Sequence, residues 1–380
     1  MPLEFVSPQH ASLIALLLIS FVICGALIYL ARFAPRLAGR SGDMRAVQAM
    51  HIGLTPRVGG IGIFGALACS AVFAPNTITQ NYTAFLAATS LIFLVGLKED
   101  LGFSVSPRVR LLAVTAASAV AIVLLGVWLP RIGVAFVDQL LAYWFIGIPF
   151  TLLITAGVAN GFNLIDGVNG LASMTAISAS IALALIAHQG GYATMVNLSL
   201  MLAAVTLGFF ILNYPFGLIF LGDAGAYTLG FVLCWFGIAV ILNVPQVSPW
   251  AILLTLFWPL ADTLLAMYRR TRTRRGAMMP DRLHAHQLVM RAIEICIIGQ
   301  HRRHIANPVT TLILAPFVIA PQIVGVVLWD QNRAAFLAVV MFLVLFFGSF
   351  ILVLSAVRHN RRPLAYNGSL AGTRSLRQNA

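Results

Sequence analysis

The chain has 380 residues, of which 60% are hydrophobic and only 9% are charged. Soluble domains carry roughly 25% charged residues, so this composition excludes an ordinary soluble protein. The net charge of +13 would suit a nucleic-acid-binding protein, but most basic residues lie between apolar stretches of about 17 to 25 residues, the length of a membrane-spanning helix. We therefore predict an all-α fold, a polytopic helical bundle in the lipid bilayer, and no nucleic-acid partner.

The apolar stretches predict about eleven transmembrane helices. The first has no basic segment before it and no small-residue cleavage site after it, so we interpret it as an uncleaved span and not a signal peptide. The four cysteines are far apart and indicate neither a disulfide framework nor a zinc site. The predicted spans cover residues 11–34, 58–75, 83–97, 110–129, 140–158, 171–188, 195–213, 224–243, 249–268, 309–329 and 334–357.

The loops between these spans differ strongly in charge. Of the 24 basic residues, 22 lie on the face of the longer loops, and only Arg131 and Arg333 lie on the other face. The positive-inside rule then places the longer loops in the cytoplasm, the N-terminus outside and the C-terminus inside. We expect residues 1–357 to form one membrane domain and residues 358–380 a basic, disordered cytoplasmic tail.

Nearly all acidic residues with a possible chemical role stand at the cytoplasmic mouths of spans. They are Glu99, Asp100, Asp166, Asp223 and Asp281. Removing a carboxylate from water costs several kcal/mol, so five such groups at one surface predict an active site built from the cytoplasmic loops. No internal repeat is evident, which argues against the transporter folds that are built from repeats.

In the segment that leads into the second span, Thr55-Pro56 can begin the helix and Gly59 and Gly60 follow in its first turns. Proline is tolerated in the first turn of a helix, and glycines allow two helices to pack closely. Close packing and a functional role both remain open for this segment.

The loop after the third span carries Glu99 and Asp100, followed by Arg108 and Arg110. Two adjacent carboxylates can supply a general base and a metal contact. The alternative is a solvated loop whose acids face water.

The loop at residues 159–172 has a polar residue at every third position: Asn160, Asn163, Asp166 and Asn169. At helical or turn spacing these groups share a face. Asp166 alone could cap the next helix, but four polar groups exceed what a cap requires, which favours a functional role.

The loop before the eighth span contains Phe220 and the sequence Gly222-Asp223-Ala224-Gly225. The start of a helix attracts phosphate through its backbone N–H groups and its dipole. Asp223 beside a phosphate requires a divalent cation between the two anions, or else it is only a cap. Phe220 can stack on a flat base or anchor the chain at the membrane interface.

The long basic loop at 269–308 contains Arg282, His284 and His286. Histidines two residues apart share a face only in an extended segment, so we expect both rings on a loop pointing one way. They suit phosphate contacts better than zinc, because further soft ligands are missing. Asp262, inside the ninth span, needs a partner there.

In this order and at these spacings, the motifs from His51 to His286 resemble those of the polyprenyl-phosphate N-acetylhexosamine-1-phosphate transferase superfamily. The resemblance implies catalytic roles for Glu99 and Asp100, where Glu99 replaces the family's usual Asp. It implies metal binding by Asp223 with Asn163. The implied nucleotide contacts are Asn160, Asp166, Asn169 and Phe220, and the implied phosphate or sugar contacts are His51, Arg108, Arg110, Arg282, His284 and His286.

The reaction implied by the resemblance is transfer of N-acetylhexosamine 1-phosphate from a UDP-sugar to undecaprenyl phosphate, with release of UMP. Magnesium is the implied cofactor, with manganese as a possible substitute, and a homodimer remains possible. The His-x-His pattern resembles the N-acetylglucosamine and O-antigen branch of lipopolysaccharide and cell-wall synthesis, in the bacterial inner membrane. The alternatives are a phospho-N-acetylmuramoyl-pentapeptide transferase and, in another class, a transporter or flippase of an anionic or lipid-linked solute.

Overall fold

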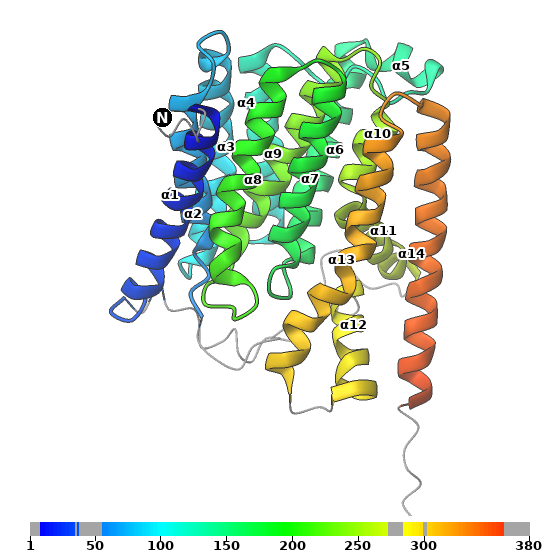
Figure 1. Ribbon diagram of the computed structural model, residues 1–380. Coiled ribbons are helices and arrows are strands. Elements are labelled where there is room, and N and C mark those ends of the chain that lie inside the picture. Colours follow the sequence, from blue (N-terminus) through cyan, green and yellow to red (C-terminus); the bar gives the residue numbers. More distant parts are fainter. Residues whose placement is uncertain (1–7, 35, 38–54, 273–283, 299–301, 361–380) are drawn as a thin grey trace, which may run out of the picture.

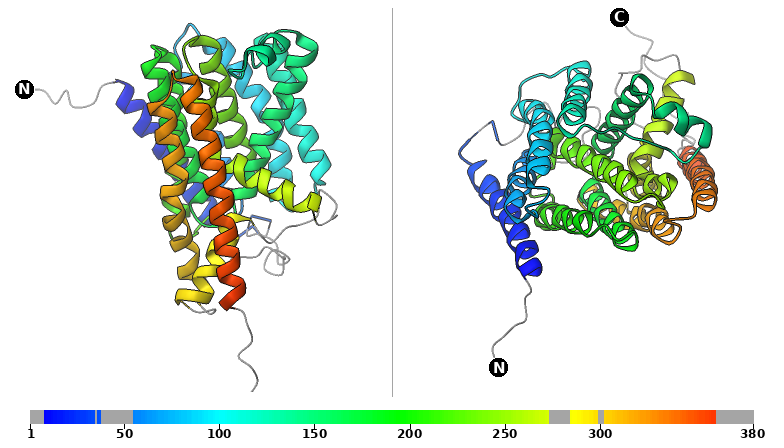
Figure 2. Two further views of the ribbon diagram at one scale, coloured as in Figure 1. Left: turned by 90° about the vertical axis from the view of Figure 1, so that its right-hand side faces the viewer. Right: turned by 90° about the horizontal axis from the view of Figure 1, so that it is seen from above.

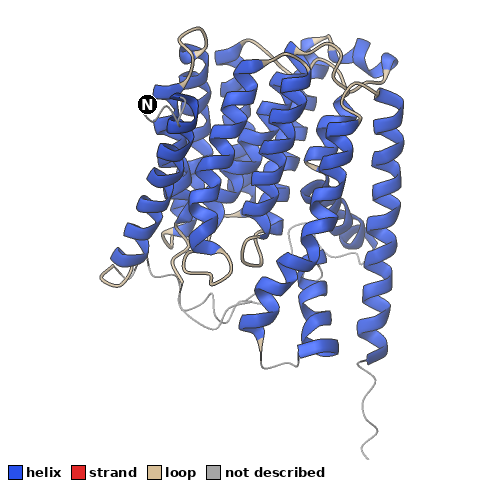
Figure 3. Ribbon diagram, in the orientation of Figure 1, coloured by secondary structure: helices blue, strands red, loops and turns tan. Residues whose placement is uncertain are grey.

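The computed structural model describes residues 8–34, 36–37, 55–272, 284–298 and 302–360, which contain helices and loops but no strand (Figure 3). The predicted all-α bundle is therefore confirmed. In chain order the helices are α1 (Pro8–Leu30), α2 (Gly59–Cys69) with a 3-10 turn (Ser70–Phe73), α3 (Thr79–Asp100), α4 (Pro107–Leu125), α5 (Ala135–Leu141), α6 (Trp144–Ile165), α7 (Leu171–Gln189), α8 (Ala193–Asn213), α9 (Gly222–Asn243), α10 (Pro249–Thr255), α11 (Phe257–Arg272), α12 (Ala285–Ile293) with a π-helical turn (Glu294–Ile298), α13 (Arg303–Val327) and α14 (Asn332–Asn360).

Nine of the described helices are long and apolar enough to cross a membrane, and each coincides with a predicted span. The two other predictions need correction. Residues 59–73 form an apolar helix that is shorter than a full span, and residues 249–269 form two helices, α10 and α11, bent by 82° at their junction. Hydropathy predicted these segments to be apolar but could not predict how far each runs along the membrane normal.

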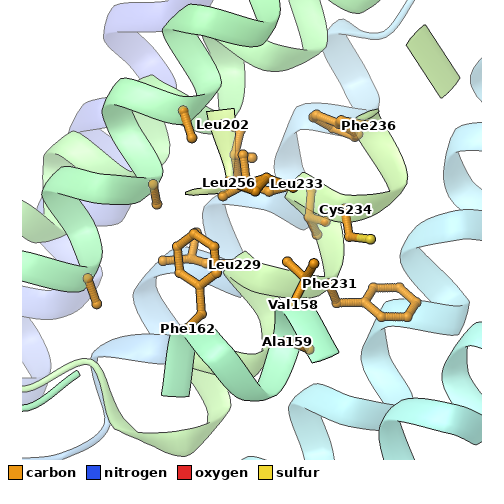
Figure 4. Close-up of a cluster of buried hydrophobic side chains, with 14 of the residues drawn as sticks. Val158, Ala159, Phe162, Leu202, Leu229, Phe231, Leu233, Cys234, Phe236 and Leu256 are labelled. Atoms are coloured by element: carbon orange, nitrogen blue, oxygen red, sulfur yellow. The ribbon is translucent and has the colours of Figure 1, made fainter. Parts of the chain in front are cut away.

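Helix α9 lies at the centre of the bundle, as the view from above in Figure 2 shows. Of its 22 residues, 19 are buried, and it packs against α3, α6, α2 and α7. Gly230 permits the close approach of α6, because a Cβ there would lie 2.7 Å from the Cα of Ala159. Figure 4 shows the adjoining core, where Leu229 of α9 lies near Phe162 of α6. The central helix is thereby fixed against its neighbours along its length.

The bend between α10 and α11 turns α11 across the long helices, as the side view in Figure 2 shows. A break in a helix leaves backbone groups without their usual partners, which is costly in a membrane. The buried side chain of Gln322, on α13, donates from Nε2 to the carbonyl oxygen of Thr255 at 3.2 Å. A polar side chain from a neighbouring helix therefore satisfies the backbone at the break.

At the end of the bundle away from the acidic loops, Arg131 binds the C-terminus of α9. Its Nη2 donates to the carbonyl oxygens of Val244 and Pro245 at 3.1 and 3.0 Å. Asp138 holds the same loop, since its Oδ1 accepts from the N–H of Ile132 at 2.7 Å. A positive group at this position stabilises the negative end of the helix dipole.

Two parts of the helical structure had no counterpart in the predicted spans. Helix α5 lies in a loop at the end of the bundle opposite the acidic loops, and α12 lies within the predicted 269–308 loop. Helix α12 and the start of α13 project beyond the ends of α7 and α8 on the side of the acidic loops (Figure 1). The predicted tail, residues 358–380, starts too early, because α14 continues to Asn360, and residues 361–380 lie outside the described residues.

Candidate active site

The N-terminus of α9 is held by the C-terminus of α3. Oδ1 of Asp100 accepts from the N–H of Asp223 at 2.8 Å, and Oδ2 accepts from the N–H of Ala224 at 2.9 Å. A carboxylate is favoured at this position because it neutralises the positive end of the helix dipole. Asp100 is buried, so the solvated-loop alternative is wrong for it. The first N–H groups of α9, which we predicted to attract phosphate, bind a carboxylate of the chain itself.

Two glycines allow this close contact. Gly222 has a φ of +75°, and a Cβ there would lie 2.1 Å from the carbonyl oxygen of Arg57 and 2.5 Å from Oδ2 of Asp100. A Cβ on Gly96 of α3 would lie 2.6 Å from the backbone of Ala224. Only glycine fits at either position without displacing the backbone.

The segment before α2 joins the same junction through backbone hydrogen bonds. The N–H of Phe220 donates to the carbonyl of Pro56 at 2.7 Å, and the N–H groups of Gly59 and Gly60 donate to the carbonyls of Phe220 and Leu221 at 2.9 Å each. A Cβ on Gly60 would lie 2.4 Å from the backbone nitrogen of Gly225. The predicted close packing is confirmed, and it fixes the backbone of half-buried Phe220 beside the start of α9.

Asp223 forms an ion pair with Arg110 of α4, through Oδ2 and Nη1. The start of α9 has no side-chain cap from its own N-cap residue, Leu221, and Asp223 is instead directed to the guanidinium. The capping alternative for Asp223 is therefore wrong. Arg108, two residues before Arg110, is exposed, so the structure brings only one of the two predicted arginines to Asp223.

Helix α6 contributes two amides to the same side of α9. The hydroxyl of Tyr227 donates to Oδ1 of Asn160 at 3.3 Å, and Nδ2 of Asn163 lies 3.4 Å from that hydroxyl. Tyr227 follows Asp223 by four residues, so both point from one face of α9. Sequence reasoning missed Tyr227, although its spacing from Asp223 was a usable signal.

Asp166 ends α6 and does not cap α7, whose N-cap is Gly170 without a side-chain bond. The pKa of Asp166 is raised to about 7. Burial is the main cause and the negative charge of Asp223 adds to it, while the charge of Arg57 and the backbone N–H of Gly222 oppose the rise. Asp100, Asp166 and Asp223 therefore lie within one electrostatic environment, as the predicted convergence of the loops requires.

Asn169 does not share the face of the other two asparagines, because α6 ends four residues earlier. Its Nδ2 donates to the carbonyl of Pro215 at 2.9 Å, and its backbone N–H donates to Oδ1 of Asn307 at 2.8 Å. Thr311 donates to its carbonyl at 2.6 Å. Asn307 was missed because the predicted span began at residue 309, and Thr311 was missed because nothing in its position within the span marks this contact.

Glu99 is half-buried beside Asp100, and its Oε2 accepts from the N–H of Val105 at 2.6 Å. It therefore helps to shape the turn between α3 and α4. Of the remaining predicted site residues, His51 and Arg282 lie outside the described residues.

His284 and His286 stack with their ring centroids 5.9 Å apart and an interplanar angle of 13°. His286 lies against the turn after α6, because a Cβ on Gly167 would lie 2.1 Å from its Nε2. Burial lowers the pKa of His286 to about 4, and both ring nitrogens lack a hydrogen-bond partner among the described residues. The structure brings this pair to the loop that carries Asp166.

The donor set suits magnesium better than a metal that needs a complete protein cage. Among the described residues, no three His, Cys, Asp or Glu side chains are grouped to hold a metal ion. Magnesium usually takes one or two carboxylates and completes its shell with water and substrate phosphates. Asp223 already holds a positive group, Arg110, and Asn163 reaches the neighbouring Tyr227. These hard oxygen ligands fit magnesium.

The site and the fold together define a polytopic membrane enzyme with its polar groups gathered at one end of the bundle. Residues 82–241 match glycosyl transferase family 4. An undecaprenyl-phosphate alpha-N-acetylglucosaminyl 1-phosphate transferase of Yersinia pestis is 29% identical over 257 residues, which cover 66% of this chain and 69% of the relative.

Two other relatives carry similar names. A probable undecaprenyl-phosphate N-acetylglucosaminyl 1-phosphate transferase of Bacillus subtilis is 28% identical, covering 65% of this chain and 69% of the relative. The undecaprenyl-phosphate alpha-N-acetylglucosaminyl 1-phosphate transferase of Escherichia coli K12 is 28% identical, covering 68% of this chain and 72% of the relative. The resemblance drawn from the motifs is confirmed, because residues 82–241 match glycosyl transferase family 4 and the relatives are named N-acetylglucosaminyl 1-phosphate transferases.

Proposed function

We propose that this protein transfers N-acetylglucosamine 1-phosphate, or a closely related N-acetylhexosamine 1-phosphate, from a UDP-sugar to undecaprenyl phosphate and releases UMP. The names of the relatives support the lipid acceptor and the sugar. The observation in the structure that carries the proposal is the meeting of Asp100, Arg110, Asp166 and Asp223 at the start of α9. Four different segments supply these charges.

The reaction joins two anions, so the site must bring positive charge to both. An oxygen of the lipid phosphate bonds to the phosphorus that bears the sugar, the bond from this phosphorus to the bridging oxygen breaks, and UMP leaves. Arg110 is held at Asp223, and the charge of Arg57 acts on Asp166. Both arginines therefore lie where they can offset phosphate charge.

Magnesium is the cofactor we propose, held by Asp223 with Asn163. When bound, it neutralises part of the diphosphate charge. Tyr227 positions Asn163 and Asn160 through its hydroxyl, and Asp100 positions Asp223 through the backbone of α9. Of the adjacent carboxylates Glu99 and Asp100, we assign proton transfer from the lipid phosphate to Glu99.

We place the site on the cytoplasmic side of a bacterial inner membrane, with the N-terminus outside. The charge asymmetry of the loops supports this orientation, and a UDP-sugar donor is a cytoplasmic metabolite. The product would then start a lipopolysaccharide or another cell-envelope polysaccharide.

The experiment is a donor screen with the purified protein in detergent. Undecaprenyl phosphate and magnesium are supplied, UMP release is measured for each UDP-sugar, and the lipid product is identified by mass spectrometry. We expect turnover with UDP-N-acetylglucosamine or a close relative and without any membrane gradient. Turnover only with UDP-N-acetylmuramoyl-pentapeptide would move the protein to peptidoglycan synthesis. No turnover by a folded protein with any donor would contradict the proposal.

A further inference from the structure

Asp262 is a fully buried carboxylate on α11 that the proposed reaction does not use. Its Oδ2 lies 2.7 Å from Nδ1 of His284, and its Oδ1 accepts from the N–H of Ala285 at 2.9 Å. Both oxygens therefore bind the start of α12, a helix 23 residues further along the chain. A buried carboxylate is expensive unless it is paired and hydrogen-bonded, and this pairing explains how Asp262 is tolerated in the bundle.

The two contacts fix different properties of the His284 segment. The bond to the N–H of Ala285 fixes the backbone at the first residue of α12. Asp262 thus does for α12 what an N-cap side chain usually does, although it lies on another helix. The bond to Nδ1 places a proton on that nitrogen, since a carboxylate accepts and does not donate. The only ring position of His284 left for a ligand is then Nε2.

The neighbouring histidine lies in a different environment. His286 is buried with two unpartnered ring nitrogens, whereas His284 is held by a carboxylate. The two rings stack, and His286 lies against Gly167 beside Asp166. Fixing His284 therefore also fixes the ring stacked on it, next to the site described above.

We propose that Asp262 is a positioning residue, which keeps the His284 proton on Nδ1 and orients the ring so that Nε2 meets the diphosphate of the nucleotide sugar. This role rests on the proposed function. A phosphate oxygen accepts hydrogen bonds, so His284 must carry a proton on Nε2 when it binds the diphosphate. With both nitrogens protonated, the ring contributes a positive charge that the Asp262 carboxylate balances.

The decisive variant is Asp262→Asn. The amide oxygen can still accept from Ala285, so the start of α12 is retained, but the amide NH₂ now donates to Nδ1. The ring then keeps one proton, on Nε2, and loses the positive charge that it would bring to the diphosphate. For histidines that bind metals, losing the orienting partner typically costs 10- to 100-fold, and we take the lower end of that scale for a phosphate contact. We expect the KM of Asp262→Asn for the UDP-sugar to rise at least about tenfold, with an unchanged melting temperature. Asp262→Glu keeps the carboxylate, so its KM should lie between those of Asp262→Asn and the unaltered protein.

Two measurements separate positioning from a merely structural role. Nitrogen-15 spectra of histidine-labelled protein, with His284 assigned from a His284→Gln sample, should show Nδ1 protonated in the unaltered protein and deprotonated in Asp262→Asn. In a double-mutant cycle, Asp262→Asn should cost no further activity once His284 is Gln, because the first residue acts through the second.

Asp138→Asn is the matched control, since Asp138 also accepts from two backbone N–H groups but lies at the opposite end of the bundle. It should leave KM unchanged. An unprotonated Nδ1 in the unaltered protein overturns the proposal, as does a full additional loss in the His284→Gln background. The spectra need no turnover, so a failure of the proposed reaction would leave the Asp262–His284 result readable on its own.

Discussion

Asp100 and Glu99 are adjacent in sequence, yet the structure gives them different surroundings. Both oxygens of Asp100 accept from the first turn of α9, whereas Glu99 binds the backbone of the α3–α4 turn. A carboxylate committed to two N–H groups is poorly placed to take a proton from a substrate. The pair therefore divides into a residue that positions α9 and a residue that binds the α3–α4 turn, to which we assign proton transfer.

This division predicts different failures for the two neutral variants. In Asp100→Asn the amide NH₂ faces an N–H of α9, so one hydrogen bond is lost and Asp223 shifts. We expect a lower melting temperature together with a weaker apparent magnesium affinity. Glu99→Gln should keep the melting temperature and the magnesium affinity of the unaltered protein. Its turnover should fall by about 10²-fold or more, the scale of losing a general base.

The measurements are thermal melts and magnesium titrations of the purified variants at saturating substrates. Glu99→Asp is the control, since it keeps the charge and should remain far more active than Glu99→Gln. If Glu99→Gln turns over normally while Asp100→Asn is stable but inactive, the two roles are reversed.

Asp223 is the residue to which we assign the metal. Asp223→Asn retains the shape of the side chain but loses its negative charge, and with it the ion pair to Arg110. Loss of one such electrostatic group should lower turnover by at least about 10²-fold, with little change in binding of undecaprenyl phosphate. Activity that remains near normal and magnesium-dependent in the folded variant would exclude Asp223 as the ligand.

The burial of His286 gives a pH dependence of stability. Its pKa is lowered from 6.5 to about 4 in the folded protein, so between these values the unfolded chain binds a proton that the folded chain does not. The folded state must therefore lose stability as the pH falls from 6.5 towards 4, at up to about 1.4 kcal/mol per unit.

The apparent melting temperature in detergent, followed from pH 7 to pH 5, checks this. The unaltered protein should melt at a lower temperature as the pH falls, and His286→Gln should show a smaller decrease over the same range. Parallel curves for the two proteins would show that His286 is not the group responsible.

Among the elements, α2 shows how glycine determines where a short helix can lie. A Cβ on Gly60 would lie 2.4 Å from the backbone of Gly225 in α9, whereas a Cβ on Gly65 of the same helix would meet only the terminal carbon of Ile23, at 3.2 Å. Gly60→Ala should therefore move α2 away from the active site and lower both stability and activity.

Gly65→Ala is the matched control and should behave like the unaltered protein. Melting temperature and UMP release measured on both variants would settle the comparison. Equal effects of the two substitutions would mean that helix propensity, and not the contact with α9, decides the outcome.

The elements also show what the sequence could predict. Nine spans were found because a continuous apolar stretch of sufficient length has one main use in a membrane. The bend before Phe257 was missed because Gln322, which satisfies it, lies on another helix. Asp166 and Asp223 were found by their position at span ends. The four-residue spacing placed Tyr227 on the face of Asp223, but its contact with Asn160 depends on the packing of α9 against α6, and Asn307 lay before the predicted start of its span.

At the scale of the whole molecule, the acidic loops lie at one end of the bundle and the Arg131 loop at the other (Figure 1). Phe216, 80% exposed in the loop between α8 and α9, and exposed Asp330, between α13 and α14, mark the two ends. In a background without the four native cysteines, Asp330→Cys should react with an impermeant maleimide on intact spheroplasts. Phe216→Cys should react only after lysis, and the opposite pattern would reverse the orientation.

Helix α9 is bound at both of its ends, by a carboxylate of α3 at the start and by the guanidinium of Arg131 at the finish. Sliding or tilting it would pull at least one charged group away from the dipole it balances. On the other side of the site, α11 turns away from α10 at an 82° bend and carries Asp262, the partner of His284, so the two histidines are positioned by an element that α9 does not hold.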